Sequence, residues 1–115
     1  MNAKEQQLLE SSIDTGSVRL KVRSRTYIDV GLWWRNKALW LVVTEHTLVV
    51  FAISRRKYIE QVPLTRCSDI HYSPASGELV ISSEPALRFP RLKMPASQAI
   101  ELIELIKQLK SRQLS

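Results

Sequence analysis

The alternation of hydrophobic and polar residues changes character along this chain and divides it into parts. Residues 1–16 contain many helix formers but few apolar positions, which predicts a short, marginal helix followed by a turn. Residues 17–30 alternate with a period of two, as expected for a long, half-buried strand. After Pro95 the period becomes 3.6, and this predicts a helix whose apolar stripe consists of Ala99, Leu102, Ile103, Ile106 and Leu109.

The most apolar stretch, residues 38–62, predicts three consecutive antiparallel strands. Two apolar runs are separated by a tight turn at residues 44–47, and a basic turn at 54–57 precedes a half-polar third run. Pro63 is suited to the end of that strand because proline cannot donate to the ladder.

Three shorter strands follow, at residues 68–72, 78–82 and 87–92. Gly77 ends a turn that needs a positive φ, and Pro90 marks the last strand as an edge or a bulge. We therefore expect a mainly β (α+β) domain in which seven antiparallel strands are closed by the C-terminal helix.

The outward face of the long first strand carries a row of cations. A strand of this length is expected to bend, either at Gly31 or near Ser24 and Thr26. The row could follow a phosphate backbone, but nucleic-acid surfaces usually interleave aromatic residues, so a solvated strand edge is favoured. The outward residues are Arg19, Lys21, Arg23, Arg25, Tyr27 and Asp29.

Composition is that of one globular domain of 115 residues. The net charge is +6, and residues 17–63 hold nine basic against three acidic side chains. This excess favours anionic partners, although a basic surface can also serve solubility alone. The single Cys67, the missing signal-peptide pattern and the missing apolar span predict a cytoplasmic protein that can sit peripherally on the inner face of the membrane.

The sequence offers little chemistry for catalysis. His46 and His71 have no ligands at metal-binding spacing, and Cys67 has no assignable His partner, so we expect no metal site and no thiol nucleophile. Three glycines are too few for a phosphate-cradling loop, and the acidic residues fall in separate turns and strand ends. We expect neither an enzyme nor a cofactor.

Several motifs together resemble the small bacterial pleckstrin-homology (PH)-like and GRAM-like domains. They are the hairpin Leu41-Val42-Val43-Thr44-Glu45-His46-Thr47-Leu48-Val49-Val50-Phe51, the step Val62-Pro63-Leu64 with Asp69-Ile70, the run Gly77-Glu78-Leu79-Val80-Ile81 and the helix 99–109. The resemblance covers residues 17–112, with 1–16 as an N-terminal extension and 113–115 as a tail. It implies a seven-stranded antiparallel sandwich or partly open barrel, in a superfold that hosts lipid binders, peptide binders and scaffolds.

The resemblance also implies that the loops at residues 31–37, 54–57 and 83–86 share one open end. There we expect a site for an anionic headgroup, formed by Arg35, Lys37, Arg55, Arg56 and Lys57. Continuing the strand register puts Trp33 outside, as a membrane or partner contact, and Trp34 inside; Trp40 belongs to the core. The expected partner is an anionic lipid or an acidic protein surface. The alternative function is a protein–protein interaction or homo-oligomerisation module without a lipid ligand.

Overall fold

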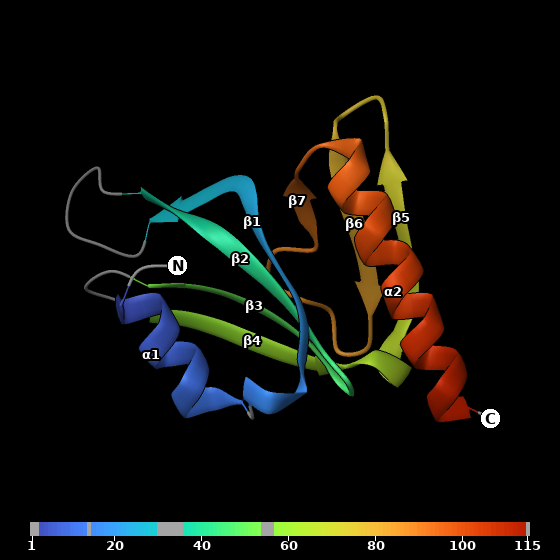
Figure 1. Ribbon diagram of the computed structural model, residues 1–115. Coiled ribbons are helices and arrows are strands. Elements are labelled where there is room, and N and C mark those ends of the chain that lie inside the picture. Colours follow the sequence, from blue (N-terminus) through green and yellow to red (C-terminus); the bar gives the residue numbers. More distant parts are fainter. Residues whose placement is uncertain (1–2, 14, 30–35, 54–56, 115) are drawn as a thin grey trace.

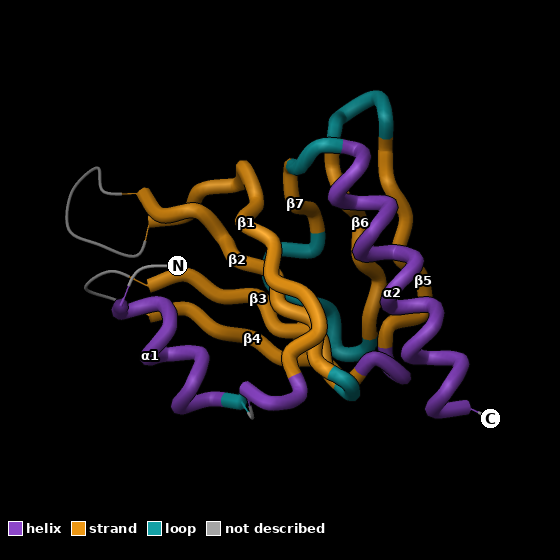
Figure 2. Tube along the Cα trace, viewed as in Figure 1, coloured by secondary structure: helices purple, strands orange, loops and turns teal. Residues whose placement is uncertain are grey.

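The computed structural model describes residues 3–13, 15–29, 36–53 and 57–114, which form two antiparallel sheets with a helix at each end of the chain (Figure 1). The two helices lie at opposite sides of the molecule (Figure 2). In chain order the elements are α1 (Ala3–Ser12), β1 (Val18–Asp29), β2 (Asn36–Thr44), β3 (Thr47–Ile53), β4 (Lys57–Pro63), β5 (Cys67–Ser73), β6 (Glu78–Ser83), β7 (Arg91–Lys93) and α2 (Ala96–Leu114), with short 3-10 turns at Thr15–Ser17 and Leu64–Arg66.

The sheets follow the order of the chain. One contains β1-β2-β3-β4 and the other β5-β6-β7, and neighbours in each sheet are consecutive in sequence. This confirms a mainly β domain with seven antiparallel strands, a C-terminal helix and a short N-terminal helix. The sheets do not close into a barrel.

The predicted bend in β1 lies where Ser24 and Thr26 are. Arg23 pairs with Trp40 of β2, whereas Tyr27 pairs with Ala38, so β1 uses four residues where β2 uses two. The Thr26 backbone N–H donates to Ser24 Oγ at 3.2 Å, and Thr26 Oγ1 accepts from the backbone N–H of Lys93 at 2.8 Å. The irregularity thus brings β1 against β7 and links the two sheets.

The main core lies between the two sheets and α2. The helical stripe is buried as predicted, with Ala99, Leu102, Ile106 and Leu109 at most 4% exposed and Ile103 packed at the edge. These side chains meet the inward rows of both sheets, including Leu41, Val50, Leu79 and Leu92. An amphipathic helix that covers an apolar sheet face removes this surface from water. The apolar stripe of the sequence therefore predicts that α2 packs on the sheets.

A second core lies on the other face of the four-stranded sheet, under α1. Leu8 and Leu9 pack there against Val42, Val49 and Phe51. The sequence predicted only a marginal helix with few apolar positions to bury. The helix nevertheless covers a core, since Leu9 and Phe51 are both fully buried. The underlying signal is that residues 38–43 of β2 and 48–53 of β3 are apolar without interruption, a pattern typical of strands covered on both faces.

Trp40 extends from β2 towards α1, at the border of this second core. Its indole Nε1–H donates to Glu5 Oε2 at 2.6 Å, and Glu5 is only 7% exposed. Trp40 is therefore packed, as predicted for a core residue, although it is not completely covered. This hydrogen bond ties the first turn of α1 to the middle of the sheet.

Glu5→Ala should lower the free energy of unfolding by about 1–3 kcal/mol, because it leaves the indole N–H of Trp40 without this acceptor. Urea denaturation measures the loss. Glu10→Ala is the matched control on the same helix: Glu10 is exposed and bonds only to Gln6 among the contacts of the described chain, so its loss should stay within about 0.5 kcal/mol. Equal losses in the two variants would contradict the anchoring role of Glu5.

The prediction of a seventh strand over residues 87–92 is wrong in its extent. The strand is β7, Arg91–Lys93, and the preceding residues leave the ladder. The backbone N–H of Arg88 donates to Glu60 Oε1 of β4 at 2.7 Å, and Phe89 packs edge-to-face on Tyr58 at 5.0 Å. Pro90 accepts from Ile81 at 2.8 Å but has no N–H to return, so regular pairing begins only after it.

The turns predicted at residues 44–47 and at Gly77 lie where expected. Thr44 Oγ1 accepts from the backbone N–H of Thr47 at 2.9 Å, which closes the β2–β3 hairpin. Gly77 has a φ of 67°, the left-handed conformation that favours glycine. The backbone N–H of Ala99 donates to Pro95 at 3.1 Å, so Pro95 stands at the start of α2 as the sequence indicates.

Candidate anion-binding site

Of the predicted site residues, one is fully described. Lys57 is the first residue of β4 and is exposed to solvent. Lys37 lies near the start of β2, and its side chain is outside the described part of the structure. Arg35, Arg55, Arg56 and the two tryptophans Trp33 and Trp34 also lie outside the described residues.

The ends of four strands meet at one end of the four-stranded sheet. Asp29, the last residue of β1, pairs with Asn36, the first of β2. Ile53 at the end of β3 pairs with Lys57 at the start of β4, and the antiparallel order puts this pair at the same end. The strands flanking the two basic loop sequences therefore converge, and we call this the basic end of the sheet.

The third predicted loop does not lie there. The backbone N–H of Glu84 donates to the carbonyl of Arg66 at 3.0 Å, and Arg66 follows the far end of β4. A strand of this length spans roughly 20 Å, so residues 83–86 lie far from Lys57. The expectation that three loops share one end is wrong, because β6 ends beside Cys67 at the start of β5.

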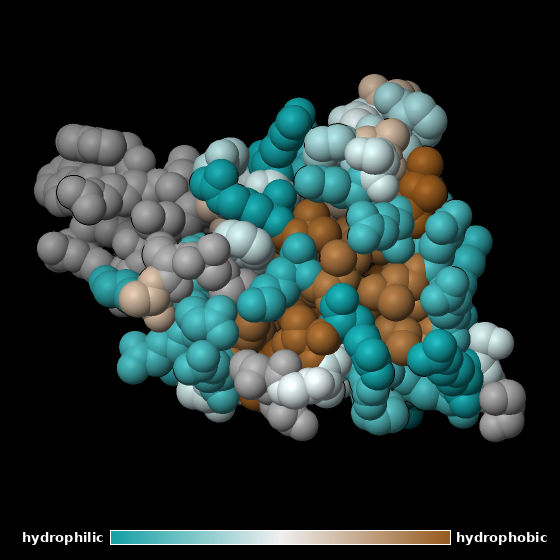
Figure 3. Space-filling model, viewed as in Figure 1, coloured by the Kyte–Doolittle hydropathy of each residue, from teal (hydrophilic) through white to brown (hydrophobic). Residues whose placement is uncertain are grey.

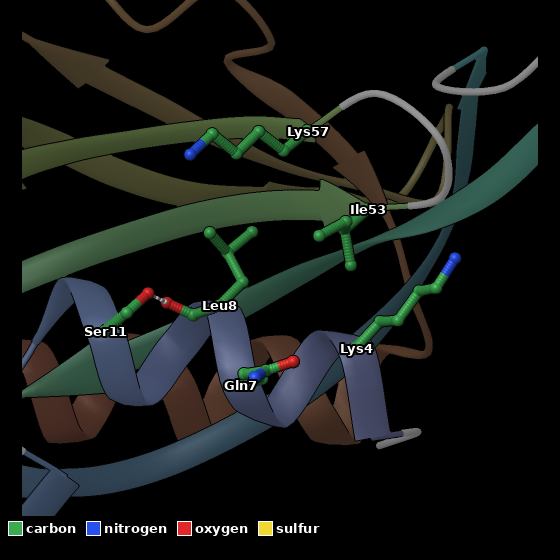
Figure 4. Close-up of a pocket in the computed structure, with 6 residues that line it drawn as sticks. All are labelled: Lys4, Gln7, Leu8, Ser11, Ile53 and Lys57. Atoms are coloured by element: carbon green, nitrogen blue, oxygen red, sulfur yellow. Dashed lines mark hydrogen bonds between the residues drawn. The ribbon is translucent and has the colours of Figure 1, made fainter.

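A pocket of about 300 Å³ opens between α1 and the basic end of the sheet. Leu8 and Ile53 lie between two cations, Lys57 on the strand side and Lys4 on the helix side (Figure 4). The ammonium groups of the two lysines point away from each other (Figure 4). Among the described residues, the lining is Lys4, Gln7, Leu8, Ser11, Ile53 and Lys57.

The polar groups of the pocket differ in what they can offer a ligand. The hydroxyl of Ser11 donates to the carbonyl of Leu8 at 2.9 Å, within its own helix. Within the described part of the chain, the side chains of Lys4, Gln7 and Lys57 make no hydrogen bond or ion pair. Two ammonium groups and one amide therefore remain as donors, and the arrangement suits an anion.

Sequence reasoning found Lys57 but missed Lys4. The helical spacing i, i+3, i+4, i+7 puts Lys4, Gln7, Leu8 and Ser11 on one face of α1, and this spacing was visible in the sequence. What the sequence did not show is that this face borders the sheet beside Ile53. The signal could be interpreted only once the docking position of α1 was known.

Two cations of β1 stand on the same face of the sheet as α1. Lys21 pairs with Val42 and Arg23 with Trp40, and directly paired residues share a face. Val42 and Trp40 belong to the core under α1. Both cations are exposed, so they add positive charge to this side of the molecule.

The titratable groups with shifted pKa values lie outside the pocket. Burial and a hydrogen bond donated to Glu60 raise the pKa of Tyr58 above its ordinary value. Burial raises the pKa of the Cys67 thiol, with Lys110 acting in the opposite direction, and Cys67 is only 1% exposed. A hydrogen bond from Ser76 and the pairing with Arg91 lower the pKa of Glu78.

The described residues outside the pocket also include a pair of titratable side chains on β5. His71 Nδ1 lies 2.7 Å from Asp69 Oδ2, but both side chains are exposed on β5. The described residues contain no group of three or more side chains that could hold a metal ion. They also contain no helix long and apolar enough to cross a membrane.

The pocket, the converging strand ends and the exposed lysines are features of this chain's own structure. Comparison with known proteins finds no matching family model, no matching curated protein and no matching solved structure.

Proposed function

We propose that this chain is a non-catalytic PH-like binding module that docks on anionic phospholipid membranes through the basic end of its four-stranded sheet. The observation that carries the proposal is the convergence of strand ends there, with Lys57 and Lys4 exposed at a pocket. The loop sequences that follow β1 and β3 contain three further cations, Arg35, Arg55 and Arg56. The PH-like assignment is supported by four plus three antiparallel strands in chain order and a C-terminal helix on the core.

The expected energetics are those of an electrostatic attachment. Each Lys or Arg close to an anionic bilayer contributes about 1 kcal/mol. Five cations, Arg35, Lys37, Arg55, Arg56 and Lys57, would give useful binding at low salt. Screening weakens the attraction as ionic strength rises, so the attachment would be reversible.

Co-sedimentation with anionic vesicles at low salt tests this proposal. The triple variant Arg55→Ala, Arg56→Ala, Lys57→Ala should bind about 100-fold more weakly, because three contributions of about 1 kcal/mol are lost. The matched control removes three cations elsewhere: Arg66, Lys93 and Lys107, all exposed. Failure of the unmodified chain to sediment with the vesicles, or equal losses in both triple variants, would refute docking through the basic end.

A second candidate function is self-assembly or protein interaction. Apolar side chains reach the surface between the four-stranded sheet and α2 (Figure 3), and partly buried Leu20, Ile103 and Leu105 border the core. Size-exclusion chromatography with light scattering tests the self-assembly version. A monomer at high protein concentration would remove it.

A further inference from the structure

The pocket beside α1 has features that a merely charged surface would not need. We infer that it is a subsite for a phosphomonoester headgroup of a membrane lipid, held by Lys4 and Lys57. The inference rests on the proposed membrane docking and specifies its ligand. Phosphatidic acid is the simplest lipid with this chemistry.

Charge matching is the first argument. A phosphomonoester carries about −1.5 to −2 charges at pH 7 because its second pKa is near 6, whereas a phosphodiester headgroup carries about one. The pocket offers two ammonium groups, from Lys4 and Lys57, and its described lining residues include no acidic side chain. Two cations balance a dianion, and they would be left partly uncompensated by a diester.

The apolar floor is the second argument, and it favours a lipid over free phosphate. Leu8 and Ile53 lie between the two lysines (Figure 4). An inorganic phosphate would gain nothing from these side chains. The glycerol and first ester carbons of a lipid could lie against them while the phosphate lies between the ammonium groups.

The ammonium groups of Lys4 and Lys57 lie at the ends of flexible side chains. Like charges repel, and the ammonium groups point apart (Figure 4). Each is a point charge on a flexible four-carbon stem, so its direction can change without moving the backbone. Gln7 provides an additional amide donor from the same helix face.

The wall of the pocket is held in place by the core under α1. Leu9 is fully buried there, and Glu5 accepts the 2.6 Å hydrogen bond from Trp40. Among the described lining residues, Lys4, Gln7, Leu8 and Ser11 come from α1, and Ile53 and Lys57 come from the sheet. The N-terminal helix therefore forms one wall of the ligand site.

Two sets of phosphatidylcholine vesicles test the inference, one containing phosphatidic acid and the other phosphatidylglycerol, adjusted to the same zeta potential. We expect the full chain to bind the phosphatidic acid vesicles about tenfold more tightly. Lys4→Ala with Lys57→Ala should abolish this preference. The matched control, Lys93→Ala with Lys107→Ala, should leave binding to both vesicles nearly unchanged and keep the preference, since both residues are exposed away from the pocket lining.

Each outcome has a distinct meaning. Equal binding of the two vesicles by the full chain, or a preference that survives loss of both lysines, overturns the subsite but leaves the membrane docking intact. No binding to either vesicle overturns both proposals.

Titration with glycerol 3-phosphate and with dihexanoyl phosphatidic acid distinguishes a soluble phosphate from a lipid headgroup. Equal affinity for the two compounds would identify a soluble phosphate as the ligand and overturn the lipid ligand. Unchanged circular dichroism melts verify that the variants fold, and Lys4→Arg with Lys57→Arg, which keeps both charges, should retain the preference.

Discussion

Phe51→Ala should lower the free energy of unfolding by about 3–5 kcal/mol. Phe51 is fully buried in β3, between Trp40 of β2 and Ile59 of β4, and it forms the centre of the core under α1. Its removal would leave a cavity that the sheet cannot close, because hydrogen bonds hold β3 on both edges. Urea denaturation followed by circular dichroism measures the effect.

The size of this effect decides whether α1 covers the sheet in solution. Tyr27→Ala is the matched aromatic control: Tyr27 lies in β1 and is 53% exposed, so its loss should stay within about 0.5 kcal/mol. A loss below about 1 kcal/mol for Phe51→Ala would mean that this face of the sheet is open to water. The pocket formed with α1 would then also be absent.

Leu102→Ala should cost about 2–5 kcal/mol through the main core. Leu102 is fully buried in the middle of the apolar stripe of α2, where it packs among side chains of both sheets. Helix α2 covers this core, so the cavity left by alanine would lie between α2 and the two sheets. Thermal unfolding should show a lower midpoint, and the denaturant slope should remain unchanged if the fold is kept.

Ile100 provides the control on the same helix. It lies two residues before Leu102 but is 50% exposed, because the helical turn carries it to the outer face. Ile100→Ala should therefore change the free energy of unfolding by no more than about 0.5 kcal/mol. Similar losses for the two variants would contradict the assigned face of α2.

The candidate site could be predicted only in part from the sequence, and the rest became visible in the tertiary structure. Lys57 was expected at an anion site because it follows two arginines in a predicted turn, and it begins β4 at the basic end. Lys4 was not expected, since an isolated lysine near a chain end carries no pattern of its own. The pocket joins them across more than fifty residues of sequence, and only packing of α1 on the sheet brings them together.

The sequence by itself determined the features that depend on neighbouring residues. The β2–β3 hairpin, the positive φ of Gly77 and the stripe of α2 all follow from short-range periodicity or from one residue's backbone preference. These preferences act within a few residues, so they are present in the sequence before any tertiary contact forms.

The tertiary structure alone decided what covers each face and which ends meet. The doubly apolar β2 and β3 require a cover on both sides, but nothing local identifies α1 as the second cover. Residues 83–86 lie opposite the basic end because the pairing of β6 with β5 turns that loop towards Arg66. Such arrangements minimise exposed apolar area and satisfy backbone hydrogen bonds over the whole chain, a global balance that no single stretch of sequence contains.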